Sequence, residues 1–210
     1  VALRSPEKIA EEIRDAVEKY GFKSIFFDDD TFNLGTKRIS KLCDYLKEIS
    51  LPWTMMGRLD ISPNWLYDKM VDSGCVGMRF GIETFNIDVL KNIEKGIERR
   101  DFRKTLEYIC LTYPEVMIHI TMMSDMPGQT AKDTEIDMNI IKEMGFTNEN
   151  ILRSYQLSKC APFPGTKLYE QMQSRLDDAT LKTYKAYDGG QDTIMKVSKK
   201  KTSTHIETWS

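Results

Sequence analysis

The fold is decided by residues 23–60, which read KSIFFDDDTFNLGTKRISKLCDYLKEISLPWTMMGRLD. A short β-rich run over 23–27 ends in three aspartates, and 53–59 has the composition of a second strand. Between them, 36–49 predicts a helix, because its apolar residues share one helical face: Ile39, Leu42, Cys43 and Leu46. Two strands joined by a helix predict a parallel pair, since parallel neighbours need a crossover connection.

The same unit recurs on both sides of this stretch. A helix begins at Ser5-Pro6-Glu7, with a capping serine and a proline at the first helical position, and Gly21 ends it. Further strands are expected at 76–82, 116–123 and 151–157, and further helices at 62–71 (opened by Ser62-Pro63), 86–95, 101–112 and 131–144. Five strands, each tied to the next by a helix, predict an α/β fold with a parallel sheet. Right-handed crossovers curl such a sheet into a barrel or partial barrel, or leave it open.

Composition bounds the class of protein. The 210 residues are 40% hydrophobic and 30% charged with a formal net charge of −2, which suits one large globular domain and gives no electrostatic reason for nucleic-acid binding. The longest apolar runs, such as 116–123, are too short to span a membrane. The four cysteines lie at least 32 residues apart (43 to 75), which excludes a CxxC-type metal motif and favours reduced thiols in the cytoplasm. We expect a core over 1–172 and a lysine-rich, partly disordered C-terminal extension over 173–210.

Polar residues follow all five predicted strands. They are Asp28, Asp29, Asp30, Arg58, Asp60, Glu83, Thr84, Ser124, Asp125, Ser158 and Lys159. Ligands of β/α sheets bind at the carboxyl ends of the strands, so this set indicates a polar site there. The alternative is that strands end in solvent, where polar residues are common in any case. His119 lies within the strand predicted at 116–123 and must face away from Ile118 and Ile120; it is a candidate substrate contact or a hydrogen-bonded core histidine. Trp53 and Trp65 are expected to be packing residues.

Six segments occur in the order found in radical S-adenosylmethionine (SAM) proteins, and the chain resembles that family over residues 4–172. They are RSPE at 4–7, FDDDTF at 27–32, Trp53 with Arg58 and Asp60, SGC at 73–75 with FGIET at 80–84, PGQT at 127–130, and PFPGT at 162–166. The branch it looks most like often carries a cobalamin-binding domain upstream. One departure is Asp125, because the family usually has glycine two residues before the proline of the PGQT segment.

The resemblance implies a partial (β/α)6 TIM-like barrel in an enzyme that reductively cleaves SAM. The product is a 5′-deoxyadenosyl radical that abstracts hydrogen from a substrate, with cobalamin-dependent methyl transfer as a further outcome. The family's [4Fe–4S] cluster is bound by a CxxxCxxC loop after the first strand. That loop and that strand are expected before residue 1, so the chain would carry the second to sixth strands and would be inactive alone. Its substrate, a small molecule or peptide, is not indicated, and the bared sheet edge favours a non-physiological dimer.

The resemblance also assigns cofactor contacts, residue by residue. Asp29 and Asp30 would face the SAM amino group, and Glu83 would bind the ribose hydroxyls. Arg58 would lie near SAM or substrate, with an ion pair to Asp60 as the alternative. Met123 and Pro127 border the turn whose backbone would lie beside the adenine; for the methionines near it, Met122, Met123 and Met126, core packing is the favoured alternative.

Two interpretations of other classes stay open. One is a non-catalytic β/α domain that binds a nucleotide or a partner protein. The other, which the sequence disfavours because it has no His-x-His pair, is a metal-dependent hydrolase using Asp28, Asp29, Asp60 and Glu83.

Overall fold

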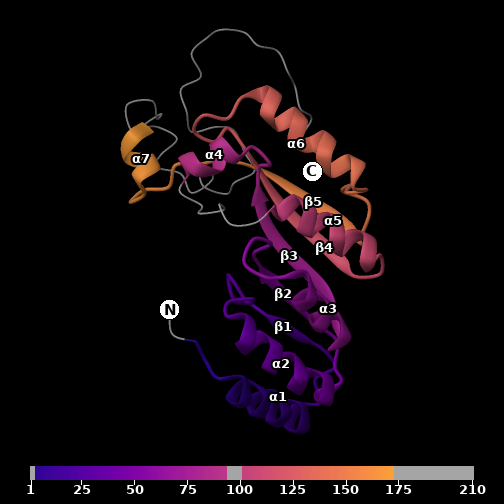
Figure 1. Ribbon diagram of the computed structural model, residues 1–210. Helices are drawn as coiled ribbons and strands as arrows, with labels where there is room; N and C mark the ends of the chain where they lie inside the picture. The colour runs from indigo at the N-terminus through magenta and orange to yellow at the C-terminus, as the bar shows by residue number, and fades with distance from the viewer. Residues whose placement is uncertain (1–2, 94–100, 173–210) are drawn as a thin grey trace. The chain divides into compact units, whose positions relative to one another are not determined.

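The computed structural model describes residues 3–93 and 101–172 (Figure 1). The chain divides after Ser158 into two compact units. The first unit holds the sheet and most of the helices, and the second contributes the short helix α7, Lys167–Met172. In that second unit, Thr166 Oγ1 donates to Phe163 O at 2.7 Å and accepts from Tyr169 N at 3.2 Å, which opens the helix.

The N-terminal elements follow the predicted order closely. Helix α1 spans Pro6–Tyr20, with the Ser5 side chain accepting from Lys8 N and with Gly21 in the left-handed conformation (φ 68°) at its end. Strand β1 is Ile25–Phe27, helix α2 is Thr36–Ile49 and strand β2 is Trp53–Gly57. Both strands are shorter than predicted.

The remaining elements repeat the strand–helix alternation. They are α3 Asn64–Asp72, β3 Cys75–Glu83, α4 Ile87–Asn92, α5 Phe102–Thr112, β4 Met117–Ser124, α6 Ala131–Glu143 and β5 Arg153–Lys159. Ser62-Pro63 does open α3, with Pro63 as the N-cap residue, but the helix begins two residues later than predicted and no side chain caps it. The predicted C-terminal extension lies outside the described residues.

The five strands form one parallel sheet in sequential order, β1-β2-β3-β4-β5. Register pairs place Phe27 beside Met55, and Met56 beside Arg79, which in turn lies beside His119. Strand β5 joins through the bond from Ile118 N to Leu152 O at 2.9 Å. Sequential order with a helix between neighbours is the pattern of a TIM-like partial barrel, as predicted.

The two faces of the sheet differ sharply in burial. Alternate residues of each strand are buried in one continuous core with the helices, including Met55, Phe80 and Ile120. The residues between them point to the opposite face, where Phe26 is 57% exposed. This alternation positions the helices on one side of the sheet and leaves the other open in the described part of the chain.

Aromatic rings fill the core beside β1 and β2. The ring of Phe27 lies 4.5 Å from that of Phe32 and 5.6 Å from that of Trp53, centroid to centroid. Trp53 is fully buried, and its indole N–H donates to Ser73 O at 3.0 Å. The packing role predicted for Trp53 is therefore confirmed. The one predicted for Trp65 is wrong, since its side chain is 51% exposed on α3.

Candidate functional site

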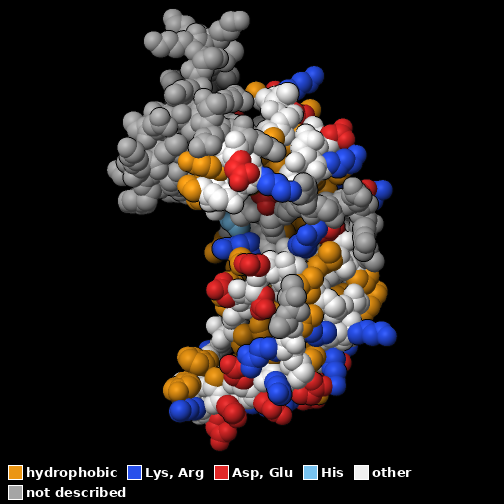
Figure 2. Space-filling model, turned by 90° about the vertical axis from the view of Figure 1, so that its left-hand side faces the viewer, with side chains coloured by type: hydrophobic (Ala, Val, Ile, Leu, Met, Phe, Trp, Pro, Cys, Tyr) orange, Lys and Arg blue, Asp and Glu red, His pale blue; other side chains and the backbone are white. Residues whose placement is uncertain are grey.

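The carboxyl ends of four strands meet at one edge of the first unit. β1 ends at Phe27, β2 at Gly57, β3 at Glu83 and β4 at Ser124. Because the strands are parallel, the polar residues that follow them lie along that edge. On the side of the molecule seen in Figure 2, acidic and basic side chains lie next to one another.

The three aspartates after β1 are exposed, so the carboxylates of Asp29 and Asp30 face solvent at this edge. The loop that carries them is anchored immediately afterwards. Phe32 is buried, and its N–H donates to Met56 O at 2.9 Å. A fixed loop with free carboxylates is suited to an ammonium group, which it can bind through charge-assisted hydrogen bonds.

The side chain of Asn33 holds this loop against the end of β2, a role that was not predicted from the sequence. Its side chain is 1% exposed; Nδ2 donates to Arg58 O at 2.7 Å, and Oδ1 accepts from Arg58 N at 3.0 Å. The same amide donates to Ser62 Oγ at 2.8 Å, while the Tyr67 hydroxyl donates to Arg58 O at 2.9 Å. A Cβ on Gly57 would lie 2.6 Å from Asn33 Oδ1. The glycine before Arg58 is the one sequence signal that could have indicated this close approach.

Arg58 forms the ion pair that was the alternative to a ligand contact. Its Nε donates to Asp60 Oδ1 at 3.0 Å and its Nη2 to Asp60 Oδ2 at 2.8 Å. The hydrogen bond to Asp60 raises the pKa of Arg58, and the Asp60 side chain is 5% exposed. These two contacts hold the guanidinium in one orientation at the end of β2, where the Arg58 side chain is partly exposed.

Strand β3 ends in a strained turn at Glu83. Glu83 has φ 67°, and Thr84 N donates back across it to Ile82 O at 2.9 Å. The register shifts between Gly81 and Glu83 at the same point. A left-handed non-glycine residue costs about 1–3 kcal/mol and is common at binding sites. The turn changes the direction of the backbone at the edge of the sheet.

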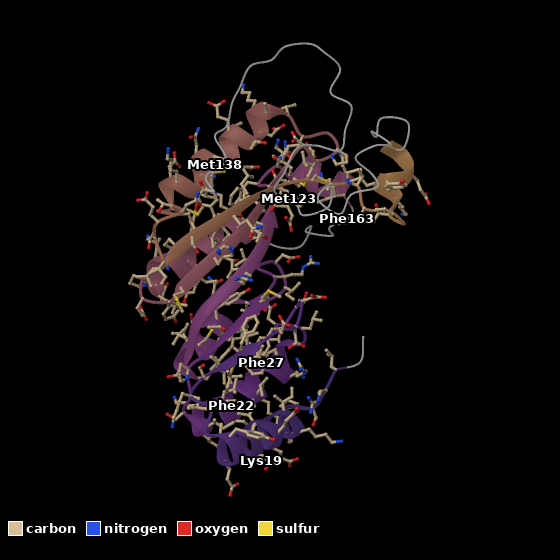
Figure 3. All side chains as sticks on the ribbon, turned by 180° about the vertical axis from the view of Figure 1, so that it is seen from behind. Lys19, Phe22, Phe27, Met123, Met138 and Phe163 are labelled. Carbon is tan, nitrogen blue, oxygen red and sulfur yellow. The ribbon has the colours of Figure 1, made fainter. Side chains whose placement is uncertain are left out.

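Strand β4 ends in a second left-handed residue, Asp125, with φ 60°. The segment that follows is held by Gln129, whose Nε2 donates to Met123 O at 3.1 Å and whose Oε1 accepts from Met126 N at 3.2 Å. Met122 and Met126 are buried, as the core interpretation predicts, whereas Met123 is half-buried at the strand end (Figure 3). Gln129 was not singled out from sequence.

Helix α6 ties the ends of β3 and β4 together. Asp137 is 3% exposed, and its Oδ1 accepts from Phe85 N at 2.8 Å. Asp133 accepts from Asn86 Nδ2 at 2.9 Å and completes a capping box at the start of α6, with Thr130 N donating to its Oδ2 at 2.7 Å. Burial raises the pKa of Asp137, and hydrogen bonds from Thr84 and Phe85 oppose that rise. Two carboxylates of one helix therefore fix the loop that carries Glu83.

On the open face, polar residues of β3, β4 and β5 lie next to one another. His119 Nδ1 lies 2.9 Å from Ser154 Oγ, and Arg79 is the register partner of His119 on β3. Burial, and then the charge of Arg79, lower the pKa of His119. As predicted, His119 faces away from Ile118 and Ile120; it is half-buried and hydrogen-bonded.

The cysteines of the chain do not fit an iron–sulfur cluster. Cys43 and Cys75 are buried, and burial raises the pKa of their thiols to about 11 and about 12, far from the thiolate form that binds iron. Across residues 3–93 and 101–172, no three His, Cys, Asp or Glu side chains gather as metal ligands would. The carboxylates of the hydrolase interpretation, Asp28, Asp29, Asp60 and Glu83, therefore do not form a metal site in the described residues. Among the helices within residues 3–93 and 101–172, none has the length and apolar composition of a membrane span.

Solved structures with the same arrangement of elements decide the fold family. The radical SAM methyltransferase TsrM of Kitasatospora setae, solved with cobalamin and a [4Fe–4S] cluster, superposes with a TM-score of 0.67 over 81% of this chain and 32% of its own, at 13% identity. Coproporphyrinogen III oxidase of Escherichia coli, described as a radical SAM enzyme, superposes with a TM-score of 0.55 over 85% of this chain and 43% of its own, at 16% identity. The chain has the radical SAM fold. The resemblance stated from the motifs is confirmed at that level.

Sequence relatives agree with this assignment. An uncharacterized methyltransferase of Pyrococcus horikoshii is 26% identical over 79% of this chain and 35% of its own length. Bacteriochlorophyllide d C-12(1)-methyltransferase of Chlorobaculum tepidum is 23% identical over 88% of this chain and 40% of its length. No family model matches the chain. The chain thus spans little more than a third of the length of these relatives.

Proposed function

We propose that this chain is the SAM- and substrate-binding core of a radical SAM enzyme. The observation that carries the proposal is the pair of left-handed non-glycine residues, Glu83 and Asp125, at the ends of adjacent parallel strands. Backbone strain of this kind persists only where the surroundings enforce it, and the hydrogen bonds of Asp137 and Gln129 do so here. The edge is therefore organised more strictly than strand ends in solvent require.

The residues at this edge fit the chemical groups of SAM. Asp29 and Asp30 offer free carboxylates to its ammonium group, and the carboxylate of Glu83 can accept hydrogen bonds from two ribose hydroxyls. The backbone at Met123 and the turn at Pro127 offer an adenine-binding surface. Arg58, held by Asp60, supplies an oriented cation at the end of β2.

The protein's contribution to catalysis is binding and exclusion of water. When SAM and a [4Fe–4S] cluster are bound, they supply the radical chemistry that removes hydrogen from a substrate. The chain's own residues would orient SAM along the strand ends and present the substrate against the open face. Because the cysteines here do not fit a cluster, we propose that its thiolate ligands come from a segment outside these 210 residues.

Methyl transfer with cobalamin is the reaction outcome that the relatives favour. Two of them are methyltransferases by name, and the TsrM structure contains cobalamin. This part of the proposal rests on similarity, since no residue of the chain points to a corrin ring.

The test uses the gene extended upstream, with the protein purified without oxygen. We expect iron and sulfide in the product, and 5′-deoxyadenosine after addition of SAM and dithionite. Glu83→Gln should weaken SAM binding at least about tenfold, which corresponds to the loss of one charged hydrogen-bonding group. The matched control is Glu115→Gln, which removes the same charge from an exposed position just before β4, at the opposite edge.

Two results would contradict the proposal. The first is an upstream sequence without a cysteine triad, together with no cluster in the protein. The second is SAM affinity that Glu83→Gln leaves unchanged. The first combined with retained nucleotide binding would favour the non-catalytic β/α binding domain.

A further inference from the structure

We infer that Arg79 and His119 bind a carboxylate of the substrate on the open face of the sheet. The inference deepens the proposed function, on which it rests, by naming the chemical class of the substrate. It concerns residues that do not belong to the strand-end set assigned to SAM.

Placement on the open face follows from the register and from burial. Arg79 and His119 are direct partners on β3 and β4, so their Cα atoms lie about 4.8 Å apart. Their chain neighbours Met78, Phe80, Ile118 and Ile120 are all buried on the helix side. Successive strand residues point to opposite faces, so both side chains project from the open face.

The guanidinium of Arg79 is available for a ligand. Arg79 is exposed, and in residues 3–93 and 101–172 its side chain has neither an ion pair nor a hydrogen bond. The other register partner of Arg79, Met56, is apolar. An exposed arginine between the apolar Met56 and the neutral donor His119 is suited to a carboxylate, whose two oxygens match its N–H fork.

His119 supplies a second, oriented donor. The Ser154 hydroxyl lies 2.9 Å from Nδ1; in the tautomer in which this hydroxyl donates to Nδ1, the ring proton is on Nε2. Burial, and then the positive charge of Arg79, lower the pKa of His119, which favours the neutral ring. A carboxylate between Arg79 and His119 would then accept from the guanidinium with one oxygen or both, and from Nε2–H.

One cation with a neutral donor suits a carboxylate better than a phosphate. A phosphate group carries about two negative charges at neutral pH, and its binding sites gather several cations or backbone N–H groups. Beside His119 the open face carries one arginine, Arg79, because the arginine at the end of the adjacent strand β2, Arg58, is paired with Asp60. We therefore infer a substrate that bears a carboxylate.

The experiment is an NMR titration of the 210-residue chain labelled with 13C at histidine Cε1. The His119 signal is assigned with a His205→Gln sample. The added compounds are benzoate, succinate and N-acetyl-tryptophan, each compared with its uncharged amide, and inorganic phosphate. We expect the carboxylates to shift the His119 signal with saturation, and the amides to leave it in place.

Variants separate a specific site from a general charge effect. Arg79→Gln should weaken carboxylate binding at least about tenfold, and Arg79→Lys should recover part of it as a single point charge. Arg103→Gln is the control, because it removes another exposed arginine, one that pairs with Glu107 on α5, on the helix side of the sheet. Ser154→Ala, which frees the tautomer of His119, should give a smaller loss. Circular dichroism and thermal unfolding check that each variant is folded.

Four outcomes would overturn the inference. They are a His119 signal that responds equally to acids and amides, phosphate binding tighter than any carboxylate, equal losses in Arg79→Gln and Arg103→Gln, and a loss of SAM affinity in Arg79→Gln. The last would place Arg79 in the SAM site. Since the titration needs neither SAM nor a cluster, its failure is distinct from failure of the proposed function.

Discussion

The two halves of the strand-end edge are built in different ways. At the ends of β1 and β2 the backbone is relaxed, and the amide of Asn33 takes both the N–H and the C=O of Arg58, as a neighbouring strand would. At the ends of β3 and β4 the backbone is left-handed at Glu83 and Asp125, and side chains from α6 and from the turn before it hold it there. The first half is positioned by pairing and the second by enforced strain. We expect substitutions in the two halves to differ in size and in sign.

The largest effect is expected from Asn33→Ala. The change leaves the N–H of Arg58 without its acceptor, removes one of the two hydrogen bonds to its C=O and removes a hydrogen bond to Ser62, so the free energy of unfolding should fall by about 3 kcal/mol. Urea unfolding followed by circular dichroism measures it. Asn148→Ala, at an exposed loop position, is the control and should change stability by less than about 0.5 kcal/mol. A loss under about 1 kcal/mol for Asn33→Ala would mean that Tyr67 alone fixes the end of β2.

Asn33 also explains why the strand there is shorter than the sequence predicts. The apolar pattern of 53–59 continues to Leu59, which is buried, yet β2 ends at Gly57. The backbone groups of Arg58 are bound to a side chain 25 residues earlier, and no local pattern reveals that. By contrast, α2 was predicted over its full length, because its stripe of Ile39, Leu42 and Leu46 is local.

The same limit applies to the candidate site. The strands, and the polar residues near their carboxyl ends, could be predicted from the alternation of apolar residues, although β2 ends two residues earlier than predicted. Asp137, which supports the Glu83 loop from 52 residues away, could not. Asp125 is an intermediate case: the resemblance indicates glycine at that position, and the structure gives the reason, because the backbone there is left-handed.

A smaller effect, with a dependence on pH, is expected from Asp137. Asp137→Ala leaves Phe85 N–H without its acceptor and should cost about 2 kcal/mol in the free energy of unfolding. Asp137→Asn keeps an acceptor oxygen and removes the buried charge. Burial raises the pKa of Asp137 in the folded protein above its unfolded value, so its contribution to stability is highest when it is protonated. That contribution declines as the pH rises from about 4 through the folded pKa.

Measured at successive pH values, the stability of Asp137→Asn relative to the original protein should therefore rise with pH. Urea unfolding at pH 4.5 and at pH 7.5 is sufficient to show the trend. A difference that stays constant, or falls with pH, would show that the folded state does not raise the pKa of this carboxyl group.

The smallest expected effect is at Asp125 and tests the backbone strain directly. Here one of the substitutions, to glycine, is expected to be the favourable one. At Asp125, glycine should give a protein about 1 kcal/mol more stable than alanine does, because only alanine resists the left-handed backbone. The matched pair at Glu135, exposed within α6, should reverse the order by about the same amount, since glycine weakens a helix interior. Thermal unfolding of the four variants gives both differences. Equal stability of the glycine and alanine variants at Asp125 would show that the backbone there is not strained, and the contrast between the two halves of the edge would then be wrong. A clear preference for glycine, joined to weaker SAM binding in the same variant, would show that the aspartate is kept for the ligand at a cost to the fold.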